Sequence, residues 1–365
     1  MIFSAIDHAH MALALRLAER GIYTTQPNPR VGCVIAHGAD IVGQGTHQRA
    51  GEAHAEVFAL REAGDKAKGA TAYVTLEPCA HFGKTPPCAN ALIEAGVARV
   101  VSACTDPNPR VAGGGVARLR EAGIVVDAGL MEAPARELNH GFLSRLERGR
   151  PWVRIKQAMS MDGRIALANG ESKWVSGEAA RADVQRWRAR SSALMTGIGT
   201  VLADNPRLTR RLDAAGEIGF KPLRVVLDSR LRTPADANIV NEQAPTLIFH
   251  SAGVAPVPYT GANPECVAVD GDGTQLDLLR VMQELANRGV NELQVEAGST
   301  LCGSLFREGL VDEMLLYVAP LFLGSDARAL LNLPPLADMA GRWSLRVLDQ
   351  RQVGNDLRLR LRKAA

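Results

Sequence analysis

One histidine, one glutamate and two cysteines constrain this chain more than any other feature of its sequence. His54 and Glu56 are separated by one residue, Cys79 follows Pro78, and Cys88 comes nine positions after Cys79. An imidazole and two thiolates are a good ligand set for zinc, and three protein ligands leave one position of a tetrahedral ion open for water. The chain must therefore fold so that three separate segments meet at one point.

This order of residues is typical of zinc-dependent deaminases that act on nucleobase-like rings. Zinc lowers the pKa of its bound water and supplies hydroxide. Glu56 is placed to take up a proton and return it to the leaving amine, so it is the candidate general acid/base. Cys79 and Cys88 are expected at or near helix N-termini, where free N–H groups favour the thiolate.

Two other interpretations of these residues stay open. In one, no metal is bound and the cysteines are buried as small hydrophobic side chains. In the other, a structural zinc ion is closed by a fourth ligand, for which the candidates are His81 and Cys104 and, at a greater distance, Cys33 and His47.

Length and composition limit the class of protein. A chain of 365 residues is too long for one core and indicates two domains. The net charge is only +3, and no basic stripe with interleaved aromatic residues predicts a nucleic-acid partner. No apolar run is long enough to cross a bilayer, and the start lacks the pattern of a signal peptide. Six cysteines in so long a chain do not form a disulfide scaffold, which suits a reducing cytoplasm.

The first half alternates helices and strands, which predicts an α/β/α sandwich with a mixed sheet. We expect helices over residues 4–20 and 54–63, from 86 to 96 and from about 115, and strands over 31–35, 41–45, 71–76, 99–104 and 124–128. A polar stretch at 139–150 precedes a new apolar strand, so we place the domain boundary between residues 147 and 148.

The second half predicts a Rossmann-like three-layer domain, but it lacks G-x-G-x-x-G after its first strand. The expected helices are 177–190, 278–288 and 301–308, and the expected strands are 153–158, 193–196, 223–227, 246–250, 267–269, 292–296, 314–319 and 357–361. Two glycine-bearing strand ends, 197–206 and 296–301, make a phosphate-bearing ligand plausible, because glycine lets the backbone approach a ligand closely.

Longer runs of the first half resemble the deaminase domain of the bifunctional riboflavin-biosynthesis deaminase/reductase family. They are residues 27–32, 45–47, 50–56, 75–88 and 106–113. Deaminases of tRNA or free cytidine usually carry C-x-x-C, whereas the riboflavin-type domain has the wide spacing found here. The family's substrate is a diaminopyrimidinone with a phosphoribosylamino group, and the resemblance implies that its pocket is lined by Asn28, His47, His81 and Lys84.

The second half is similar to the reductase domain of the same family, a relative of dihydrofolate reductase in fold. The matching runs are 156–164, 170–174, 197–206, 208–211, 227–229 and 296–301. The resemblance implies that the substrate is held by Ser172, Arg188, Leu208, Arg211 and Glu296, and that Lys156 and Asp204 lie near the ribose that accepts hydride. It implies that NADPH is held by Ala158, Trp174, Thr200, Asp204, Ser229, Gly298, Ser299, Thr300, Leu301, Cys302, Gly303 and Ser304.

The resemblance therefore implies a two-domain α/β enzyme of riboflavin synthesis. Residues 1–147 would form a cytidine-deaminase-like α/β/α domain that binds one Zn²⁺ per chain and deaminates 2,5-diamino-6-(5-phosphoribosylamino)pyrimidin-4(3H)-one. Residues 148–365 would form a dihydrofolate-reductase-like Rossmann-type domain that uses NADPH to reduce the ribosyl group to ribityl. We expect a cytoplasmic homo-oligomer, a dimer or tetramer, that acts on a small molecule and binds neither nucleic acid nor membrane.

Two alternatives come from other classes of protein. One is a nucleoside or tRNA deaminase fused to an unrelated nucleotide-binding domain, against which the absence of C-x-x-C argues. The other is a zinc-stabilised ligand-binding or regulatory protein, against which Glu56 beside an open coordination position argues. Ammonia release from the phosphoribosylated pyrimidine separates these classes, because only the riboflavin-type enzyme is expected to catalyse it.

Overall fold

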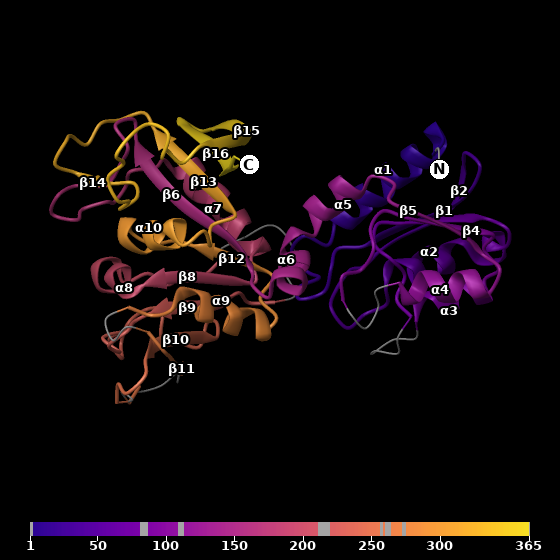
Figure 1. Cartoon of the computed structure of the whole chain (residues 1–365), viewed down its shortest axis with the longest axis horizontal. Helices are drawn as coiled ribbons and strands as arrows, with labels where there is room; N and C mark the ends of the chain where they lie inside the picture. The colour runs from indigo at the N-terminus through magenta and orange to yellow at the C-terminus, as the bar shows by residue number, and fades with distance from the viewer. Residues whose placement is uncertain are drawn as a thin grey trace. The chain divides into compact units, whose positions relative to one another are not determined.

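The chain divides into two compact units, whose main segments meet between Gly149 and Arg150 (Figure 1). The structure is a computed structural model, and it describes residues 3–80, 87–108, 113–210, 220–255, 258–259, 264–271 and 275–364. Each unit has its own sheet and its own buried hydrophobic residues, so each is described by itself.

The first unit is built on a five-stranded sheet in the order β2-β1-β3-β4-β5. β1 (Gly32–His37) pairs antiparallel with β2 (Asp40–Thr46) and with β3 (Thr71–Val74). β3 pairs parallel with β4 (Arg99–Ser102), which pairs parallel with β5 (Val125–Ala128). The sheet is therefore mixed, as expected from the sequence.

Helix α1 (Ala5–Glu19) covers one face of this sheet. It begins after Ser4, which forms a capping box with Asp7 and thereby satisfies free N–H groups of the first turn. The helix lies directly on β1, because a Cβ on Gly32 would be 2.0 Å from the carbonyl oxygen of Ala14. Only glycine fits at this contact.

Helix α2 (Ala55–Ala63) covers the opposite face. Gly32 pairs with Thr46, so the preceding residue of β2, Gly45, points to the other side of the sheet. A Cβ on Gly45 or Gly43 would lie within 2.2 Å of a carbonyl oxygen of α2. Helix and strand backbones are thus in direct contact. We call this contact of Gly43 and Gly45 with α2 the glycine seam, and it fixes the position of the beginning of α2.

The other helical segments of this unit are η1 (Gly64–Ala67), α3 (Cys88–Glu94), α4 (Gly114–Glu121), α5 (Glu132–Leu138) and α6 (His140–Arg148). α3 contacts α2 and α4, while α5 contacts α1, which completes the α/β/α layering (Figure 1). The stretch expected to be a polar boundary segment is mostly helix α6. Besides its charged residues, this helix has a buried face that contains Phe142 and Leu143.

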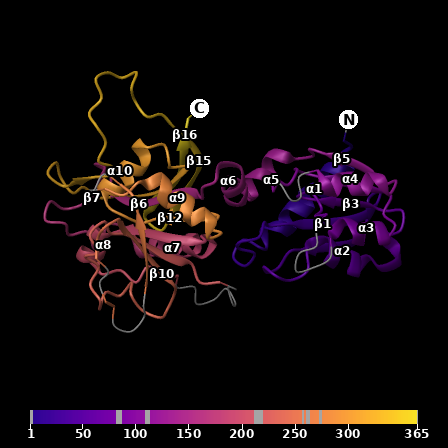
Figure 2. The same ribbon diagram turned by 60° about the horizontal axis from the view of Figure 1, so that its bottom comes forward.

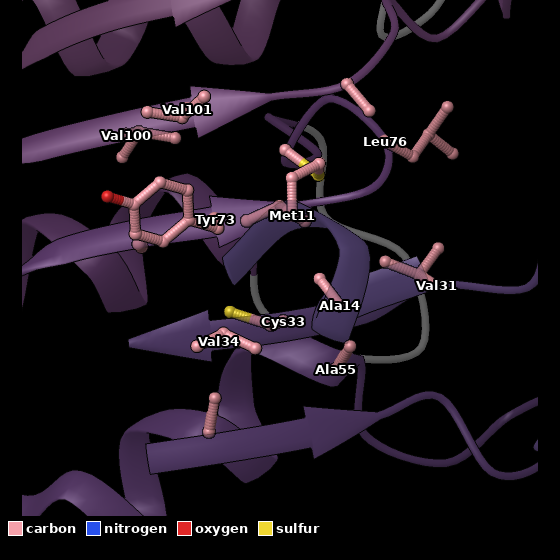
Figure 3. Packing of buried hydrophobic residues seen from close by; sticks show 14 of the residues in the cluster. Met11, Ala14, Val31, Cys33, Val34, Ala55, Tyr73, Leu76, Val100 and Val101 are labelled. Atoms are coloured by element: carbon pink, nitrogen blue, oxygen red, sulfur yellow. The ribbon is translucent and has the colours of Figure 1, made fainter. Parts of the chain in front are cut away.

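Apolar side chains from α1 and the central strands form the core of the first unit. Met11 of α1, Val34 of β1, Tyr73 of β3 and Val100 of β4 are almost completely buried together (Figure 3). The one polar atom of Tyr73 is satisfied, because its hydroxyl donates to Asp7 at 2.8 Å. This core holds in place the elements around the candidate metal ligands, which lie at the beginnings of α2 and α3 and in the loop after β3.

The second unit contains a nine-stranded sheet in the order β11-β10-β9-β8-β12-β6-β13-β16-β15. The strands from β11 to β13 are parallel, and the β16–β15 hairpin adds antiparallel strands at one edge. Their bounds are β6 (Trp152–Ser160), β8 (Ala193–Gly197), β9 (Leu223–Leu227), β10 (Thr246–Ser251), β11 (Glu265–Val269), β12 (Glu292–Val295), β13 (Glu313–Ala319), β15 (Leu345–Val353) and β16 (Asp356–Lys363). A separate pair joins β7 (Arg164–Ala166) to β14 (Arg328–Ala329).

Helices lie on both faces of this second sheet (Figure 2). They are α7 (Glu178–Arg190), α8 (Ile198–Asp204), α9 (Leu278–Asn287) and α10 (Ser299–Arg307). On β13, Leu315 packs with Trp187 of α7, whereas its neighbour Met314 packs with Phe306 of α10. Successive residues of a strand point to opposite faces, so α7 and α10 lie on different sides of the sheet. The expected three layers are confirmed.

Four elements of the second unit were not expected from the sequence: the short pair β7 and β14, the edge strand β15 and helix α8. β15 shows no regular alternation, since it is exposed over most of its length at the edge of the sheet. α8 occupies the run that we expected only as a glycine-bearing strand end. None of the helices in the described ranges has both the length and the apolar character needed to cross a bilayer.

Candidate active sites

Three potential metal ligands meet in the first unit. His54 is the N-cap of α2, Cys79 lies in the loop after β3, and Cys88 is the first residue of α3. Nδ1 of His54 lies 3.0 Å from Sγ of Cys88 and 3.6 Å from Sγ of Cys79, and all donor atoms lie within 4.8 Å of one another. Tetrahedral zinc, with bonds of about 2.0 to 2.3 Å, holds such ligand atoms about 3.5 Å apart. The arrangement fits zinc, and no second group of this kind occurs in the described part of the chain.

Glu56 lies in the first turn of α2 beside this group. The residue is 3% exposed, and within the described structure its Oε2 has no hydrogen-bond partner. A buried carboxylate oxygen without a partner is costly unless a further group occupies the site, and a metal-bound water would satisfy it. Burial raises the pKa of Glu56, which His54 partly opposes. A carboxylate with a raised pKa is suited to take up a proton and release it again.

The two thiols influence each other strongly. The hydrogen bond from Cys88 lowers the pKa of Cys79 to about 4, against the opposing effect of burial, and His54 also lowers it. The same hydrogen bond raises the pKa of Cys88, since a second thiolate beside the first is repelled. A dication between the sulfur atoms removes that repulsion and favours both thiolates.

The described candidates for a fourth protein ligand lie outside this group. Cys104 contacts the carbonyl oxygen of Thr75 at 3.8 Å, and burial raises the pKa of its thiol to about 12. Cys33 is fully buried in the core, where burial raises its pKa well above the usual value (Figure 3). His81 lies outside the described residues. The described residues thus leave the coordination position beside Glu56 open.

Asn28 and His47 form a polar pair next to the metal ligands. Nδ1 of His47 lies 3.1 Å from the carbonyl oxygen of Ala53, which fixes a proton on Nδ1 and makes Nε2 an acceptor. Nε2 then accepts a hydrogen bond from the Asn28 amide at 3.1 Å. Burial lowers the pKa of His47, so the ring is neutral. The centroids of the His47 and His54 rings are 5.5 Å apart. The two other expected pocket residues, His81 and Lys84, lie outside the described residues.

The second unit contains a cavity of about 1290 Å³ at the carboxyl ends of its parallel strands. β12 is inserted between β8 and β6, so the strand order changes direction there, and ligands of open α/β sheets bind at such a point. The expected residues that line the cavity are Lys156, Ala158, Ser172, Trp174, Arg188, Thr200, Asp204, Leu208, Ser229, Glu296, Gly298, Ser299, Thr300, Leu301 and Ser304.

Two expected cofactor residues do not reach this cavity. Cys302 is fully buried, and its thiol contacts the carbonyl oxygen of Ala297 at 3.5 Å within the core. Gly303 faces away as well, because a Cβ there would lie 2.3 Å from the carbonyl oxygen of Asn332. Helical periodicity turns these two positions of α10 away from Gly298–Leu301. The expected substrate residue Arg211 lies outside the described residues.

An ion pair lies in the cavity wall. Nε and Nη2 of Arg188 donate to the two carboxylate oxygens of Glu296 at 2.7 and 2.8 Å, and Nη1 donates to the carbonyl oxygen of Thr209 at 2.7 Å. Burial by itself would raise the pKa of Glu296, but Arg188 outweighs it and the pKa falls to about 2. Burial lowers the pKa of Lys156, an effect that Glu296 opposes and Arg188 reinforces. These charges are placed to bind an anionic ligand and to move a proton.

The beginning of α10 fits a phosphate group. Its N-cap, Gly298, has no side chain to accept hydrogen bonds, so the first turn, whose residues line the cavity, has no side-chain cap. No acidic residue lies in that turn. A helix N-terminus of this kind attracts a phosphate through its N–H groups and its dipole. Trp174, which is 67% exposed, adds a flat aromatic surface to the wall.

Some residues of the wall were not expected from the sequence. Asn205 and Asn238 line the cavity, and the Asn238 amide donates to the carbonyl oxygen of Asn205 at 3.0 Å. Lys173 also lines it and approaches the carboxylate of Asp204 at 3.8 Å. Lys173 and Asn205 fall within the runs that carry the resemblance, but no local pattern marks Asn238.

Two family models match the chain. The model of the RibD C-terminal domain matches residues 151–359, and the model of the cytidine and deoxycytidylate deaminase zinc-binding region matches residues 4–104. The chain is 48% identical over 367 residues to the riboflavin biosynthesis protein RibD of Escherichia coli, covering 97% of this chain and 99% of the relative. It is 47% identical to RibD of Haemophilus influenzae, covering 98% and 97%.

Solved structures show the same similarity. RibD of Acinetobacter baumannii superposes with a TM-score of 0.91 at 45% identity, covering 99% of both chains. A Thermotoga maritima protein described as a diaminohydroxyphosphoribosylaminopyrimidine deaminase/5-amino-6-(5-phosphoribosylamino)uracil reductase superposes with a TM-score of 0.86 at 31% identity, covering 98% of this chain and 99% of that one. The similarity extends through both units.

Proposed function

The chain belongs to the RibD family of bifunctional riboflavin-biosynthesis enzymes, and we propose that it acts in turn on the two phosphoribosylated pyrimidines named for its Thermotoga relative. It is a zinc-dependent deaminase and an NADPH-dependent reductase. The observation that carries the proposed substrate is the pairing of an open three-ligand metal site with a cavity whose charges suit a phosphorylated sugar.

We assign deamination to residues 1–147, with His54, Cys79 and Cys88 as zinc ligands. Bound zinc supplies a water whose pKa is lowered to about 7. Glu56 then takes the proton from the attacking water and delivers it to the ring amine, which leaves as ammonia. The neutral His47 orients Asn28, and together they hold the pyrimidine edge. His81 and Lys84 complete the proposed pocket.

We assign reduction to residues 148–365. When bound, NADPH would supply the hydride; the start of α10 would hold its pyrophosphate, and Ala158, Trp174, Thr200 and Ser229 would hold the rest of the cofactor. We place the substrate against Arg188 and Glu296, with Ser172, Leu208 and Arg211 as further contacts. Arginine's planar fork suits the substrate phosphate, and because Glu296 engages the fork of Arg188, we assign the phosphate to Arg211. Lys156 and Asp204 face the ribosyl group, and the lowered pKa of Lys156 suits proton delivery to the opened sugar.

We further propose that the enzyme is cytoplasmic and forms a homo-oligomer, a dimer or a tetramer. All six cysteines are free, which suits a reducing compartment. Large apolar side chains are exposed near and on the edge strand β15, among them Met339 at 72% and Val347 at 55%. Sedimentation of the purified chain measures the oligomeric state, and a monomer at micromolar concentration contradicts this part of the proposal.

A reciprocal pair of substitutions tests the division of labour. Glu56→Gln should keep zinc, lower ammonia release by about 10² to 10⁴-fold, and leave reduction of the deaminated intermediate intact. Asp204→Asn should strongly reduce the NADPH-dependent step and leave ammonia release unchanged, because each domain has its own core and chemistry. Glu52→Gln is a matched control, since this exposed carboxylate lies two residues before His54.

Three results would contradict this assignment. Loss of zinc from Glu56→Gln, with activity proportional to the remaining metal, would make Glu56 a structural residue. A fall of both activities in either well-folded variant would show a shared or tightly coupled site. Absence of ammonia release from the parent enzyme with the named pyrimidine would exclude the substrate itself.

A further inference from the structure

Glu77 is a buried carboxylate that has no direct role in the chemistry described above. It lies two residues before Cys79 and is 3% exposed. Within the described part of the chain, all the partners of its carboxylate are backbone N–H groups. The donors are Asp106 (3.3 Å) and Gly113 (3.1 Å) to Oε2, and Gly115 (3.1 Å) and Val116 (3.2 Å) to Oε1.

These donors include the free N–H groups at the beginning of α4. The N-cap of this helix is Gly113, which has a φ of 75° and no side chain that can accept a hydrogen bond. Glu77 therefore caps α4 from a distant segment of the chain. Its negative charge is favourable there, because the N-terminus of a helix carries partial positive charge.

A second contact fixes the same segment. A Cβ on Gly115 would lie 1.8 Å from the carbonyl oxygen of Pro78, so the first turn of α4 lies directly against the residue between Glu77 and Cys79. The other side of Cys79 is held by α3, since the N–H of Ala89 donates to the Cys79 carbonyl oxygen at 3.2 Å. The backbone around Cys79 is thus fixed on both sides, by α4 before it and by α3 after it. Glu77 makes the hydrogen bonds of the α4 contact.

We propose that Glu77 is a positioning residue for the zinc site: its carboxylate ties the loop after β3 to α4 and thereby sets where the Cys79 thiolate meets His54 and Cys88. This inference rests on the zinc site proposed above. Two acceptor oxygens are required, because a glutamine would present an NH₂ group to two N–H donors. An aspartate keeps the charge but is one methylene too short to reach all the donors.

The test compares Glu77→Gln with Glu62→Gln in the full-length enzyme. Glu62 is a matched control, because its carboxylate also accepts a backbone N–H, that of Gln44 at 2.8 Å, but ties α2 to β2 instead of holding a metal ligand. The measurements are the Kd for zinc, by competition with a chromophoric chelator, and the visible absorption of the Co²⁺-substituted protein, which reports ligand geometry. NADPH-dependent reduction serves as a control for the rest of the chain.

We expect Glu77→Gln to raise the Kd for zinc by about 10 to 100-fold and to shift the Co²⁺ bands, the usual effect of removing an outer partner of a metal ligand. Glu62→Gln should change neither. An unchanged Kd and spectrum in Glu77→Gln overturn the proposal, even if the thermal stability falls. If the first unit of that variant does not fold, Glu77→Asp decides: a shifted Co²⁺ spectrum supports the role, and the parent spectrum overturns it. Failure of the parent to bind zinc would instead contradict the proposed function.

Discussion

The two active sites differ in how the chemistry is distributed over the chain. In the first unit, the three metal ligands and Glu56 lie on three short segments. Each of these side chains contributes an atom that no neighbouring residue can supply. In the second unit, the cavity is lined by many residues from strands, loops and helices, and the ion pair of Arg188 with Glu296 lies in its wall. The first site should therefore respond to single substitutions in an all-or-none way, whereas the second should lose activity gradually.

The largest expected effect is the loss of a metal ligand. Cys79→Ser or Cys88→Ser should remove the zinc, reduce deamination to background and destabilise the first unit, because metal binding contributes to folding there. Reduction should persist. Metal analysis and ammonia release measure the result, with Cys104→Ser as the control thiol, which should keep one zinc per chain. A full complement of zinc in either ligand variant would overturn the ligand assignment and the contrast between the two sites.

The next effect concerns the ion pair of the second unit. Arg188→Met leaves the Glu296 carboxylate in the cavity wall without its counter-ion, and we expect a loss of about 3 kcal/mol in the free energy of unfolding of that unit. Reduction should fall and deamination should not. Arg288→Met is the matched control, because its pairs with Glu284 and Glu265 are more exposed and should contribute less than about 1 kcal/mol each. If the two substitutions lower the free energy of unfolding in urea equally, the ion pair in the cavity wall stabilises the unit no more than an exposed pair does.

Acid should weaken the second unit through the same carboxylate. Because the folded-state pKa of Glu296 is about 2, against an ordinary value of 4.5, its contribution to stability is complete above about pH 4.5 and is lost as the pH falls towards 2. We expect the stability difference between the parent and Glu296→Gln to shrink by about 2 kcal/mol between about pH 6 and pH 3. Urea unfolding at several pH values, followed by tryptophan fluorescence, measures this, since all four tryptophans lie in the second unit. A difference independent of pH would mean that the carboxylate is not held ionised by Arg188.

The smallest expected effect is at the aromatic wall of the cavity. Trp174→Ala removes one exposed contact surface and should raise the KM for NADPH by about 2 to 10-fold with little change in kcat, the worth of a single aromatic contact. Trp343→Ala, which changes a tryptophan outside the cavity wall, should leave this KM unchanged. A loss of more than a thousandfold in kcat at Trp174 would contradict the gradual response that we expect of the second site.

The contrast also explains how much could be predicted from the sequence. His54, Glu56, Cys79 and Cys88 are chemically rare residues at fixed local spacings, so the metal group could be predicted from the residues alone and the structure brings it together. The second site offers no such local signal. Trp174, Thr200 and Ser229 could be expected there only by resemblance, because single side chains in turns are equally typical of ordinary loops.

The differences between the expectations and the structure have physical causes as well. Cys302 and Gly303 were included with their neighbours, but the helical repeat of α10 turns them towards the core and the Asn332 backbone. β15 was missed because an exposed edge strand needs no alternating apolar pattern. Residues 140–148 seemed too polar for a buried element, yet a helix can hide one apolar face behind its charges, as α6 does with Phe142 and Leu143.

The glycine seam between β2 and α2 limits how the deaminase half can change its specificity in evolution or in the laboratory. Because Gly43 and Gly45 bring backbone against backbone, the register of α2 does not depend on any side chain that mutation can enlarge or trim in small steps. Any replacement at these glycines displaces the whole helix, together with His54 and Glu56. Adaptation to substrates with other rings must therefore come from peripheral side chains such as Asn28, while α2 keeps its position.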